Sequence, residues 1–495
     1  MMRIDKTSLW LPFVSGMLLS LTLPAFGVWH LVWVALVPFI IFASQKELSY
    51  KKLCLGTLLF GVPYAIVVTY PLMQVTSWWW TAGSESFGST LLELQFAFII
   101  FLVGFWGALF FLPVAYTARR VGHRPYGGMI IALMWIAIEW LRSSFALFGY
   151  SWGVLGYTLL DGRYLKHVAV LFGVYGLSLL VVVVNIAITE LYRQLEGEET
   201  RWWKKFRALF VAPKKFVFVW FAVSIFIVML GFGVTQERYV AAQSGTCDTP
   251  LRVAVIGSNI PTDDSVDVES YQQYRARISE ALALGARIVV LPENVFPYFE
   301  INEGDGSLNG RNAVPLPEQN ELYTDLLSLS RTYSDASIAA GLHTKIGRDR
   351  FNSLVVFERG TPNAYYHKRK LVPFAEYAPL SLNMSIIMSF ARGEREQYFA
   401  IQGLRSTALM CSEVSDATIP LRGAQLIISP SNDSVFGSEA IKIVHERMAR
   451  MRALEAEAFL FRATKGGISS IVGPSGVIIK ENRGEEILVA DICVQ

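Results

Sequence analysis

The chain contains 495 residues, of which 53% are hydrophobic and only 17% are charged. This composition is too apolar for an ordinary soluble protein, and four cysteines do not make a disulfide-stapled scaffold. The net charge of +3 says little about partners, and we expect no nucleic-acid partner.

The apolar residues lie mainly before Gly233, in stretches that are each near the ~20 residues needed to cross a membrane. The sequence therefore predicts an α-helical transmembrane domain of about seven helices over residues 1–235, a linker over 236–250 and a second domain over 251–495. A cleaved signal peptide is the alternative for the first stretch, although Pro24-Ala25-Phe26 lacks a small-x-small cleavage pattern. The predicted spans are 9–23, 27–44, 53–73, 93–117, 127–141, 168–191 and 215–234.

Lysine and arginine are concentrated in the segments that face the cytoplasm if the N-terminus is cytoplasmic. These inside segments contain Arg3, Lys6, Lys46, Lys51, Lys52, Arg119, Arg120, Arg124 and the basic run from Arg193 to Lys215. The outside loops contain only Arg142, Arg163 and Lys166. An odd number of spans then places everything after Gly233 outside the cytoplasm.

From Leu251 onward, short β-branched runs alternate with amphipathic helical patterns. Such alternation indicates an α/β layered domain, in which sites form where strands end. The predicted strands are 251–256, 287–291, 337–342, 353–357, 406–410, 425–429, 459–462 and 468–472. The predicted helices are 268–284, 318–333 and 439–457.

Three residues of this domain carry groups suited to covalent acyl chemistry. Cys411 ends the apolar run 406–410, Glu293 closes the buried-strand pattern 287–292, and Lys368 lies in a basic run. A thiol, a carboxylate and an ammonium group supply a nucleophile, a proton acceptor and an oxyanion partner. The ordinary alternatives are a buried structural cysteine and a solvated basic run. Without a glycine-rich phosphate loop, a CxxC motif or clustered histidines and cysteines, we expect no metal and no cofactor.

These three residues resemble the Glu-Lys-Cys triad of the carbon–nitrogen hydrolase (nitrilase) superfamily. The whole chain is similar, more specifically, to the membrane-integral family of apolipoprotein N-acyltransferases. The most specific match is residues 367–376 (HKRKLVPFAE). The other matches, in chain order, are 23–29 (LPAFGVW) with 33–38 (WVALVP), 139–142 (EWLR) with 149–152 (GYSW), 173–178 (GVYGLS) with Asn185, 431–433 (SND) and 450–455 (RMRALE).

The resemblance implies a nitrilase-like αββα sandwich and a two-step reaction in the bacterial inner (cytoplasmic) membrane. Cys411 would take an acyl chain from a phospholipid donor, which gives a thioester and a lysophospholipid. The α-amine of the N-terminal diacylglyceryl-cysteine of a lipoprotein would then attack the thioester and form an amide. A catalytic domain that faces the periplasm agrees with the charge asymmetry of the loops.

The resemblance also implies a role for each site residue. Glu293 would take the thiol proton and later return it to the leaving group. Lys368 would stabilise the tetrahedral oxyanion together with a backbone N–H near Ser412. By family position, Glu376 and Glu413 would orient Lys368 and the nucleophile.

Several positions depart from the family pattern. The family usually has tyrosine directly after the nucleophile, where this chain has Ser412, and tryptophan where it has Val435. A second tryptophan gives way to the run 262–266, and the Arg-Ala-Thr-Asn pattern ends in Lys465. Family members commonly carry one more span after the catalytic domain, whereas this sequence stops at Gln495 without one. Because aromatic-to-small changes alter what a pocket contacts, both an ordinary N-acyltransferase and a paralogue with another acceptor amine or donor lipid remain open.

Two further functions remain open: a membrane-tethered amidase that hydrolyses a C–N bond, and a non-catalytic membrane protein that uses the fold for binding. Cys247 and Cys493 bracket the second domain, and a disulfide between them is an alternative to free thiols. We expect Arg452 and Glu455, three residues apart on a helix, to form a structural ion pair.

Overall fold

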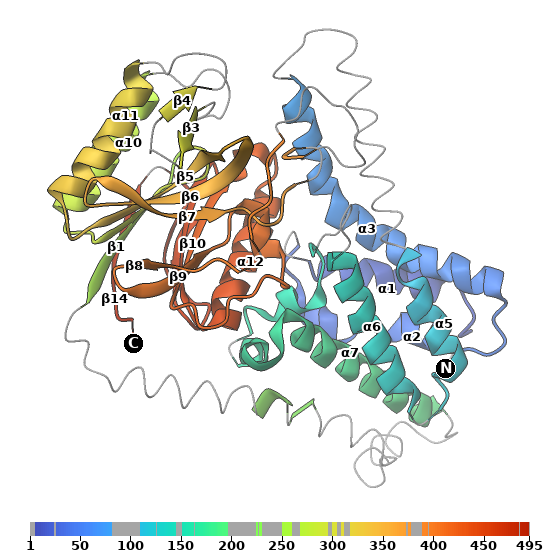
Figure 1. The fold of residues 1–495 in the computed structure, drawn as a ribbon. Helices are drawn as coiled ribbons and strands as arrows, with labels where there is room; N and C mark the ends of the chain where they lie inside the picture. The colour runs from blue at the N-terminus through green and yellow to red at the C-terminus, as the bar shows by residue number, and fades with distance from the viewer. Residues whose placement is uncertain are drawn as a thin grey trace. The chain divides into compact units, whose positions relative to one another are not determined.

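The computed structural model describes residues 5–23, 26–81, 109–124, 126–144, 151–162, 164–196, 224–225, 227–229, 250–259, 268–295, 299–303, 308–310, 317–372, 375–377, 389–394, 396–484 and 486–494. Its contacts divide the chain into two compact units, which Figure 1 colours along the sequence. One unit comprises residues 1–239 with 437–444, and the other 240–436 with 445–495. The predicted domain boundaries stay a prediction, because residues 230–249 lie outside the described part of the chain.

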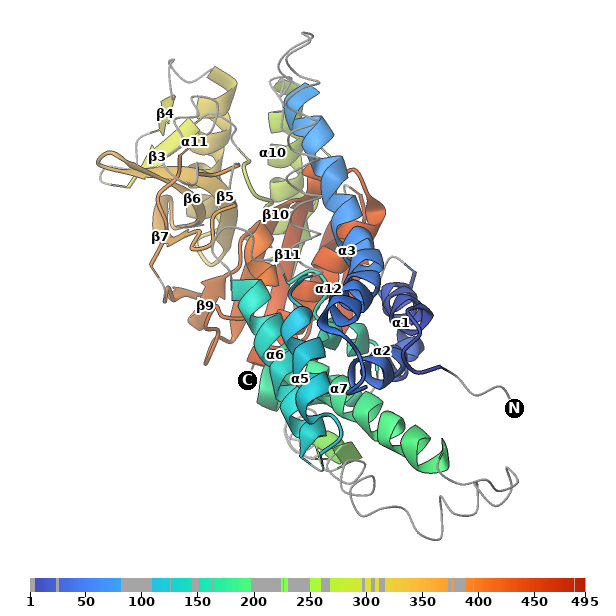
Figure 2. The same cartoon turned by 90° about the vertical axis from the view of Figure 1, so that its right-hand side faces the viewer.

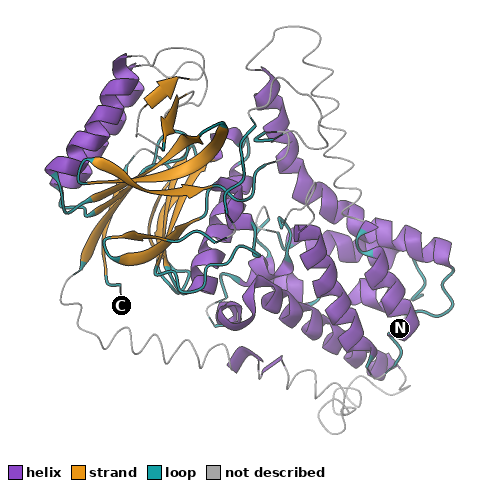
Figure 3. Ribbon diagram, in the orientation of Figure 1, coloured by secondary structure: helices purple, strands orange, loops and turns teal. Residues whose placement is uncertain are grey.

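The first unit is helical over its described residues (Figure 3), as the apolar sequence predicts. Its elements are α1 (Trp10–Leu21), η1 (Trp29–Trp33), α2 (Val37–Ala43), α3 (Tyr50–Thr81), α5 (Leu112–Val121), α6 (Gly127–Ser144), η2 (Leu155–Leu159), η3 (Leu165–His167) and α7 (Val168–Glu196). Among the residues that the structure describes, two stretches, Tyr50–Val68 and Leu165–Arg193, are long and apolar enough to cross a membrane.

The predicted count of seven spans stays a prediction. The 12 residues of α1 extend only about 18 Å at 1.5 Å per residue, less than the ~30 Å hydrocarbon core. The span predicted at 93–117 is described only from residue 109, and most of the span predicted at 215–234 lies outside the described residues.

A buried amide fixes the helices of the first unit to one another. The Asn185 side chain on α7 accepts a hydrogen bond from the Leu36 N–H at 3.0 Å and donates to the Val32 carbonyl at 2.8 Å. Both partners lie where η1 passes into α2, so their backbone groups have no complete helical ladder. This contact gives a structural reason for Asn185, one of the residues that carry the family resemblance.

The second unit contains two β-sheets, each with a parallel centre. The first has the order β14-β1-β2-β5-β3-β4, with β6 and β7 added antiparallel beside β5. Its strands are β1 (Leu251–Ile256), β2 (Ile288–Val290), β3 (Phe299–Asn302), β4 (Leu308–Gly310), β5 (Ser337–Ile346), β6 (Asp349–Glu358), β7 (Thr361–His367) and β14 (Ile487–Ile492). The second has the order β13-β12-β11-β10-β9-β8. Its strands are β8 (Phe399–Ile401), β9 (Leu404–Ala408), β10 (Leu426–Asn432), β11 (Phe459–Lys465), β12 (Ser469–Val472) and β13 (Ile478–Asn482).

The two sheets pack face to face and are covered by helices on their outer sides (Figures 1 and 2). One apolar core joins the sheets through residues such as Val253, Val290, Met410 and Phe461. A second core lies between the first sheet and the helices α10 (Val268–Ala283) and α11 (Pro317–Thr332). Helix α12 (Glu439–Ala456) runs along the outer side of the second sheet. The α/β sandwich of two sheets between helices that the sequence predicts is therefore confirmed.

Every strand and helix predicted after Leu251 coincides with an observed element to within a few residues. The predictions succeed where a strand is covered on both faces, as for β2, whose three residues are all buried. The sequence analysis did not predict β3, β4, β7, β8, β13 and β14. Most of these strands are short or lie at a sheet edge, where no long apolar run distinguishes them from loops.

Candidate active site

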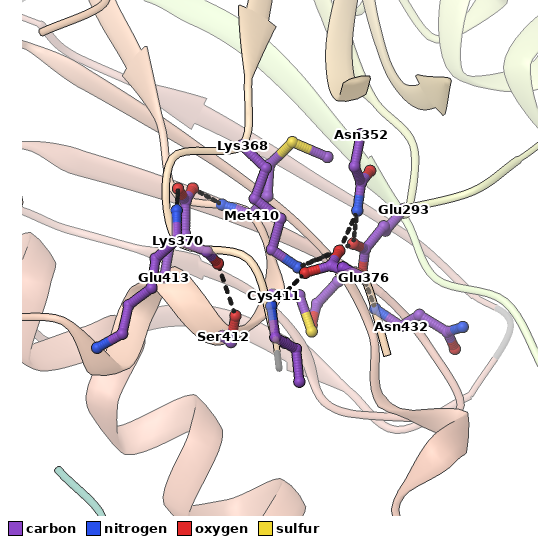
Figure 4. A network of polar contacts seen from close by, with 12 residues as sticks. Glu293, Asn352, Lys368, Lys370, Glu376, Met410, Cys411, Ser412, Glu413 and Asn432 are labelled. Carbon is purple, nitrogen blue, oxygen red and sulfur yellow. Dashed lines mark hydrogen bonds and ion pairs between the residues drawn. The ribbon is translucent and has the colours of Figure 1, made fainter. Parts of the chain in front are cut away.

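Residues that follow three different strands converge at one end of the sandwich. Glu293 follows β2, Lys368 directly follows β7, and Cys411 follows β9 of the other sheet. The Lys368 ammonium lies 2.8 Å from Glu376 Oε1 and 3.5 Å from Glu293 Oε1. Figure 4 shows these side chains pointing toward one another beside the Cys411 sulfur. The structure thus brings together the residues that the sequence analysis selected.

The Glu293 carboxylate is held in place through both of its oxygens. Asn352 on β6 donates to Oε1 at 2.7 Å, and the Asn432 N–H at the end of β10 donates to Oε2 at 3.0 Å. Strand β5 passes unusually close behind it, because a Cβ at Gly341 would lie 2.5 Å from the Glu293 Cα. Glycine is needed at this position since any side chain would push the carboxylate out of place.

Glu376 connects Lys368 to the rest of the site. Its Oε2 accepts from the Val372 N–H at 2.7 Å, and its Oε1 accepts from Asn352 at 2.7 Å in addition to Lys368. Burial by itself would lower the pKa of Lys368, but the carboxylates of Glu376 and Glu293 outweigh it and raise that pKa. Lys368 therefore stays charged at neutral pH, which an oxyanion partner requires.

Cys411 occupies a backbone conformation that is uncommon for a residue with a side chain. Its φ is +45°, in the left-handed region, which costs of order 1–2 kcal/mol for a non-glycine residue. The turn lets β9 pass at once into the short helix η5 (Cys411–Ser415). Unlike the buried Lys368 and Glu293, Cys411 is only partly buried. Burial raises the pKa of its thiol to about 12, with Glu293 adding to the shift and Lys368 opposing it. The thiol therefore keeps its proton at neutral pH until a base removes it.

Glu413 ties the turn of Cys411 to the loop that carries Lys368. Its Oε2 accepts from the Met410 N–H at 2.8 Å and from the Tyr366 hydroxyl at 2.7 Å. Its Oε1 accepts from the backbone N–H groups of Arg369 at 2.6 Å and Lys370 at 3.1 Å. Burial raises the pKa of Glu413, while Arg369 and the Met410 N–H oppose that shift. The Glu413 carboxylate thus joins the turn at Cys411 to the loop that carries Lys368, although these two segments are remote in sequence.

The chain matches known protein families over most of its length. A family model for the apolipoprotein N-acyltransferase N-terminal domain matches residues 15–187, and one for carbon-nitrogen hydrolase matches residues 252–495. An apolipoprotein N-acyltransferase from Geobacter metallireducens is 26% identical, with 96% of this chain and 87% of that protein covered. One from Haemophilus ducreyi is 24% identical, with 95% and 87% covered. The chain belongs to the apolipoprotein N-acyltransferase family.

Among solved structures, a mutant of the Nesterenkonia AN1 amidase from the nitrilase superfamily is 19% identical, with a TM-score of 0.37. The match covers 49% of this chain and 90% of that chain.

Two of the positions that depart from the family pattern lie beside site residues in the chain: Ser412 directly follows Cys411, and Val435 lies three residues after Asn432. Ser412, where the apolipoprotein N-acyltransferases usually have tyrosine, donates a long hydrogen bond of 3.4 Å to the Lys370 carbonyl. Val435 ends the short helix η6 (Asp433–Val435), which follows β10. The run 262–266 lies outside the described residues. These substitutions leave the hydrogen bonds of Glu293, Lys368 and Glu376 in place.

Three contacts at the site were missed from the sequence. Asn352 directly precedes the predicted strand 353–357, and a single polar residue at that position has no distinctive sequence signal. Asn432 was noted as part of a motif but not as a backbone donor to Glu293. His445 gave no signal, because a single histidine on an amphipathic helix has no distinctive spacing. The predicted ion pair between Arg452 and Glu455 is present.

The structure tests the predicted Cys247–Cys493 disulfide only at Cys493. Cys493 is disulfide-bonded, whereas Cys54 and Cys411 are free. Its predicted partner, Cys247, lies outside the described residues.

Lys465 places a second buried amine near the Glu293 carboxylate, where the family usually has asparagine. It pairs with Asn432 across β10 and β11, and its ammonium donates to the Asn294 carbonyl at 2.6 Å. Burial lowers the pKa of Lys465 to about 7, although Glu293 works in the opposite direction. Asn294, which follows Glu293 in the chain, is therefore held by Lys465, whose ammonium loses its charge near neutral pH.

Lys465→Met is expected to reduce the rise of stability with pH between pH 7 and about 10. In this window the unfolded lysine, with a pKa of about 10.4, binds a proton that the folded protein excludes, so stability of the wild type increases with pH. Below pH 7 both states bind the proton, and the contribution no longer changes. Thermal unfolding of the detergent-solubilised protein from pH 6 to 9.5 measures the difference. Parallel curves for variant and wild type would contradict the prediction, and Lys345→Met serves as a control with a less buried lysine.

Proposed function

We propose that this protein is an apolipoprotein N-acyltransferase that transfers an acyl chain from phospholipid, through a thioester on Cys411, to the α-amine of the N-terminal diacylglyceryl-cysteine of a lipoprotein. The observation that carries the proposal is the match to this family over nearly the whole chain. The site agrees with it, because Glu293, Lys368 and Cys411 come together there.

In the first step, the Cys411 sulfur attacks the ester carbonyl of the phospholipid while Glu293 takes the thiol proton. The carbonyl oxygen gains negative charge, and the Lys368 ammonium, with the Ser412 N–H, stabilises it. The C–O bond then breaks, and the leaving lysophospholipid oxygen takes the proton from Glu293. A base is needed because the pKa of Cys411 near 12 leaves almost no thiolate at neutral pH.

In the second step, the α-amine attacks the thioester carbonyl and loses a proton to Glu293. The new tetrahedral intermediate uses the same oxyanion donors, the C–S bond breaks, and the Cys411 sulfur recovers the proton. Since the Lys368 ammonium is buried and hydrogen-bonded to Glu376 before substrate arrives, little reorganisation of this donor is required in either step.

We further propose that this is a multi-pass protein of the bacterial inner membrane whose second unit faces the periplasm. The distribution of lysine and arginine over the predicted loops supports this orientation. The disulfide of Cys493 also supports it, because disulfides persist in oxidising compartments.

Purified full-length protein, given phospholipid in detergent, is expected to gain the mass of one acyl chain on Cys411. Hydroxylamine should release the adduct, because thioesters are cleaved by this nucleophile, and Cys411→Ala should not form it. A diacylated lipopeptide added next should discharge the adduct and gain the same acyl mass. The measurement is intact-protein and peptide mass spectrometry.

The outcomes separate the competing functions. Absence of an adduct with every phospholipid supplied would contradict the acyltransferase, and release of ammonia from a small amide without phospholipid would favour the amidase. An adduct that forms but is not discharged by the lipopeptide would favour a paralogue with another acceptor. The observation that favours such a paralogue is the size of Ser412 and Val435, which are both smaller than the aromatic residues usual in the family.

A further inference from the structure

A charged cluster adjoins the backbone carbonyl of the nucleophile, and no step of the proposed reaction uses it. It consists of His445 on α12, Asp433 in η6 and Arg462 on β11, all completely buried. Arg462 pairs with the Asp433 carboxylate at 2.9 Å, and the Ser431 hydroxyl donates to the same carboxylate at 2.6 Å. Burial alone would raise the pKa of Asp433, but Arg462 and His445 outweigh it and hold that pKa well below its usual range. The carboxylate is thus a permanent negative charge.

His445 connects this cluster to the backbone of the nucleophile. Its Nε2 lies 3.0 Å from the Cys411 carbonyl oxygen, and its Nδ1 lies 3.0 Å from Asp433 Oδ1. A carbonyl oxygen only accepts hydrogen bonds, so Nε2 carries the hydrogen and donates it. The ring of Phe436 meets the imidazole edge-on at 5.5 Å and limits its rotation further. The imidazole is therefore fixed in both position and orientation.

The Cys411 carbonyl matters because it shares a peptide plane with the Ser412 N–H. In a trans peptide the C=O and N–H bonds point in opposite directions, so fixing one direction fixes the other. No cis peptide bond occurs in the described part of the chain, and Cys411 adopts the left-handed φ of +45°. Such a conformation persists only where the surroundings determine it. If this peptide rotated, the Ser412 N–H would no longer point toward the oxygen that becomes negative.

We infer that His445 is a positioning residue for the oxyanion site: its Nε2–H holds the Cys411 carbonyl, and thereby aims the Ser412 N–H at the oxygen that becomes negative. Asp433, anchored by Arg462 and Ser431, holds the imidazole in turn. Gly467 allows this arrangement, because a Cβ there would lie 2.5 Å from Asp433 Oδ2. The inference rests on the proposed function, since it assumes that Cys411 forms a tetrahedral intermediate.

Two amide substitutions separate the two ends of the imidazole. Glutamine places its amide nitrogen near the position of Nε2, so His445→Gln keeps a donor to the Cys411 carbonyl. Asparagine reaches only the position of Nδ1, so His445→Asn keeps the contact with Asp433 and loses the donor. Removing one oxyanion donor typically costs 10²–10³ in rate. We expect His445→Asn to acylate Cys411 about a hundredfold more slowly at saturating phospholipid, with KM within about twofold, and His445→Gln to recover most of the rate.

A second readout distinguishes positioning from general damage. Alkylation of Cys411 by iodoacetamide passes through no oxyanion, so His445→Asn should be alkylated within about threefold of the wild-type rate. Acylation and alkylation that fall together, or acylation by His445→Asn at the wild-type rate, would overturn the inference. If His445→Asn does not fold, Asp433→Asn takes its place, with an acylation rate about tenfold lower expected and the wild-type rate overturning it. Wild-type protein that forms no thioester at all would instead refute the proposed function.

Discussion

Lys368→Met is expected to slow thioester formation on Cys411 by at least about a thousandfold. Loss of one oxyanion donor accounts for 10²–10³ of this. The rest of the loss in rate is expected because Glu293 and Glu376 no longer have a cation between them. The Glu293 carboxylate, which accepts the thiol proton, is then no longer held in place by an ion pair. The measurement is single-turnover acylation by phospholipid, followed by the mass of the Cys411 adduct.

The neighbouring Lys370 provides a matched control for this change. Its ammonium is partly exposed and pairs with Asp416 at 3.2 Å rather than with the site. Lys370→Met should therefore acylate within about threefold of the wild-type rate. If both variants lose activity equally, the basic run acts through its total charge and Lys368 has no specific role as the oxyanion partner. A Lys368→Met rate within tenfold of wild type would rule out its oxyanion role.

Breaking this buried charge group should also lower the free energy of unfolding. Removing one partner of a buried ion pair typically costs about 3–5 kcal/mol, because the other charge remains buried without compensation. The acylation assay must therefore be run well below the thermal midpoint of the variant. Phospholipid turnover that returns at lower temperature would show that unfolding, and not chemistry, caused the loss.

Glu413→Ala is expected to lower the free energy of unfolding by about 3–5 kcal/mol, as much as the loss of the Lys368 charge. The change leaves the buried N–H of Met410 and the partly buried N–H groups of Arg369 and Lys370 without their acceptor. Each unsatisfied buried donor costs about 1–3 kcal/mol before the surroundings relax. Denaturant or thermal unfolding of the detergent-solubilised protein measures this loss.

Two further variants define the effect of Glu413. Glu413→Gln keeps one acceptor oxygen, so we expect roughly half the loss. Glu394→Ala removes an exposed carboxylate of the same domain and should change stability by no more than about 0.5 kcal/mol. A Glu413→Ala protein as stable as Glu394→Ala would mean that water replaces the carboxylate, and that the two loops are not held together by it.

The sequence was sufficient to predict the elements of the second unit that lie at its centre. Strands such as β2 and β10 are buried on both faces, and long apolar runs bounded by polar residues identify them. The same reasoning placed Glu293 and Cys411 at strand ends. Edge strands such as β4 and β8 have three residues each and no such run, so local pattern could not reveal them.

The helical unit shows a different limit. Hydropathy identified the apolar stretches, and the residues around α3 and α7 meet the length and composition of membrane spans. Hydropathy does not show how helices are joined, because that depends on isolated polar contacts. Asn185 accepts from Leu36 about 150 residues earlier in the chain, a contact that only the folded structure reveals.

By itself, the sequence determined which groups can react and where each lies along the chain, because side-chain chemistry and strand periodicity are local properties. Only the tertiary structure decided how those groups are held. It placed Asn352 between two carboxylates, Glu413 between two loops and His445 beside the backbone carbonyl of the nucleophile. These contacts join residues remote in sequence, and they form only when two sheets and a helix pack into one core, since burial removes the water that would otherwise satisfy the same groups.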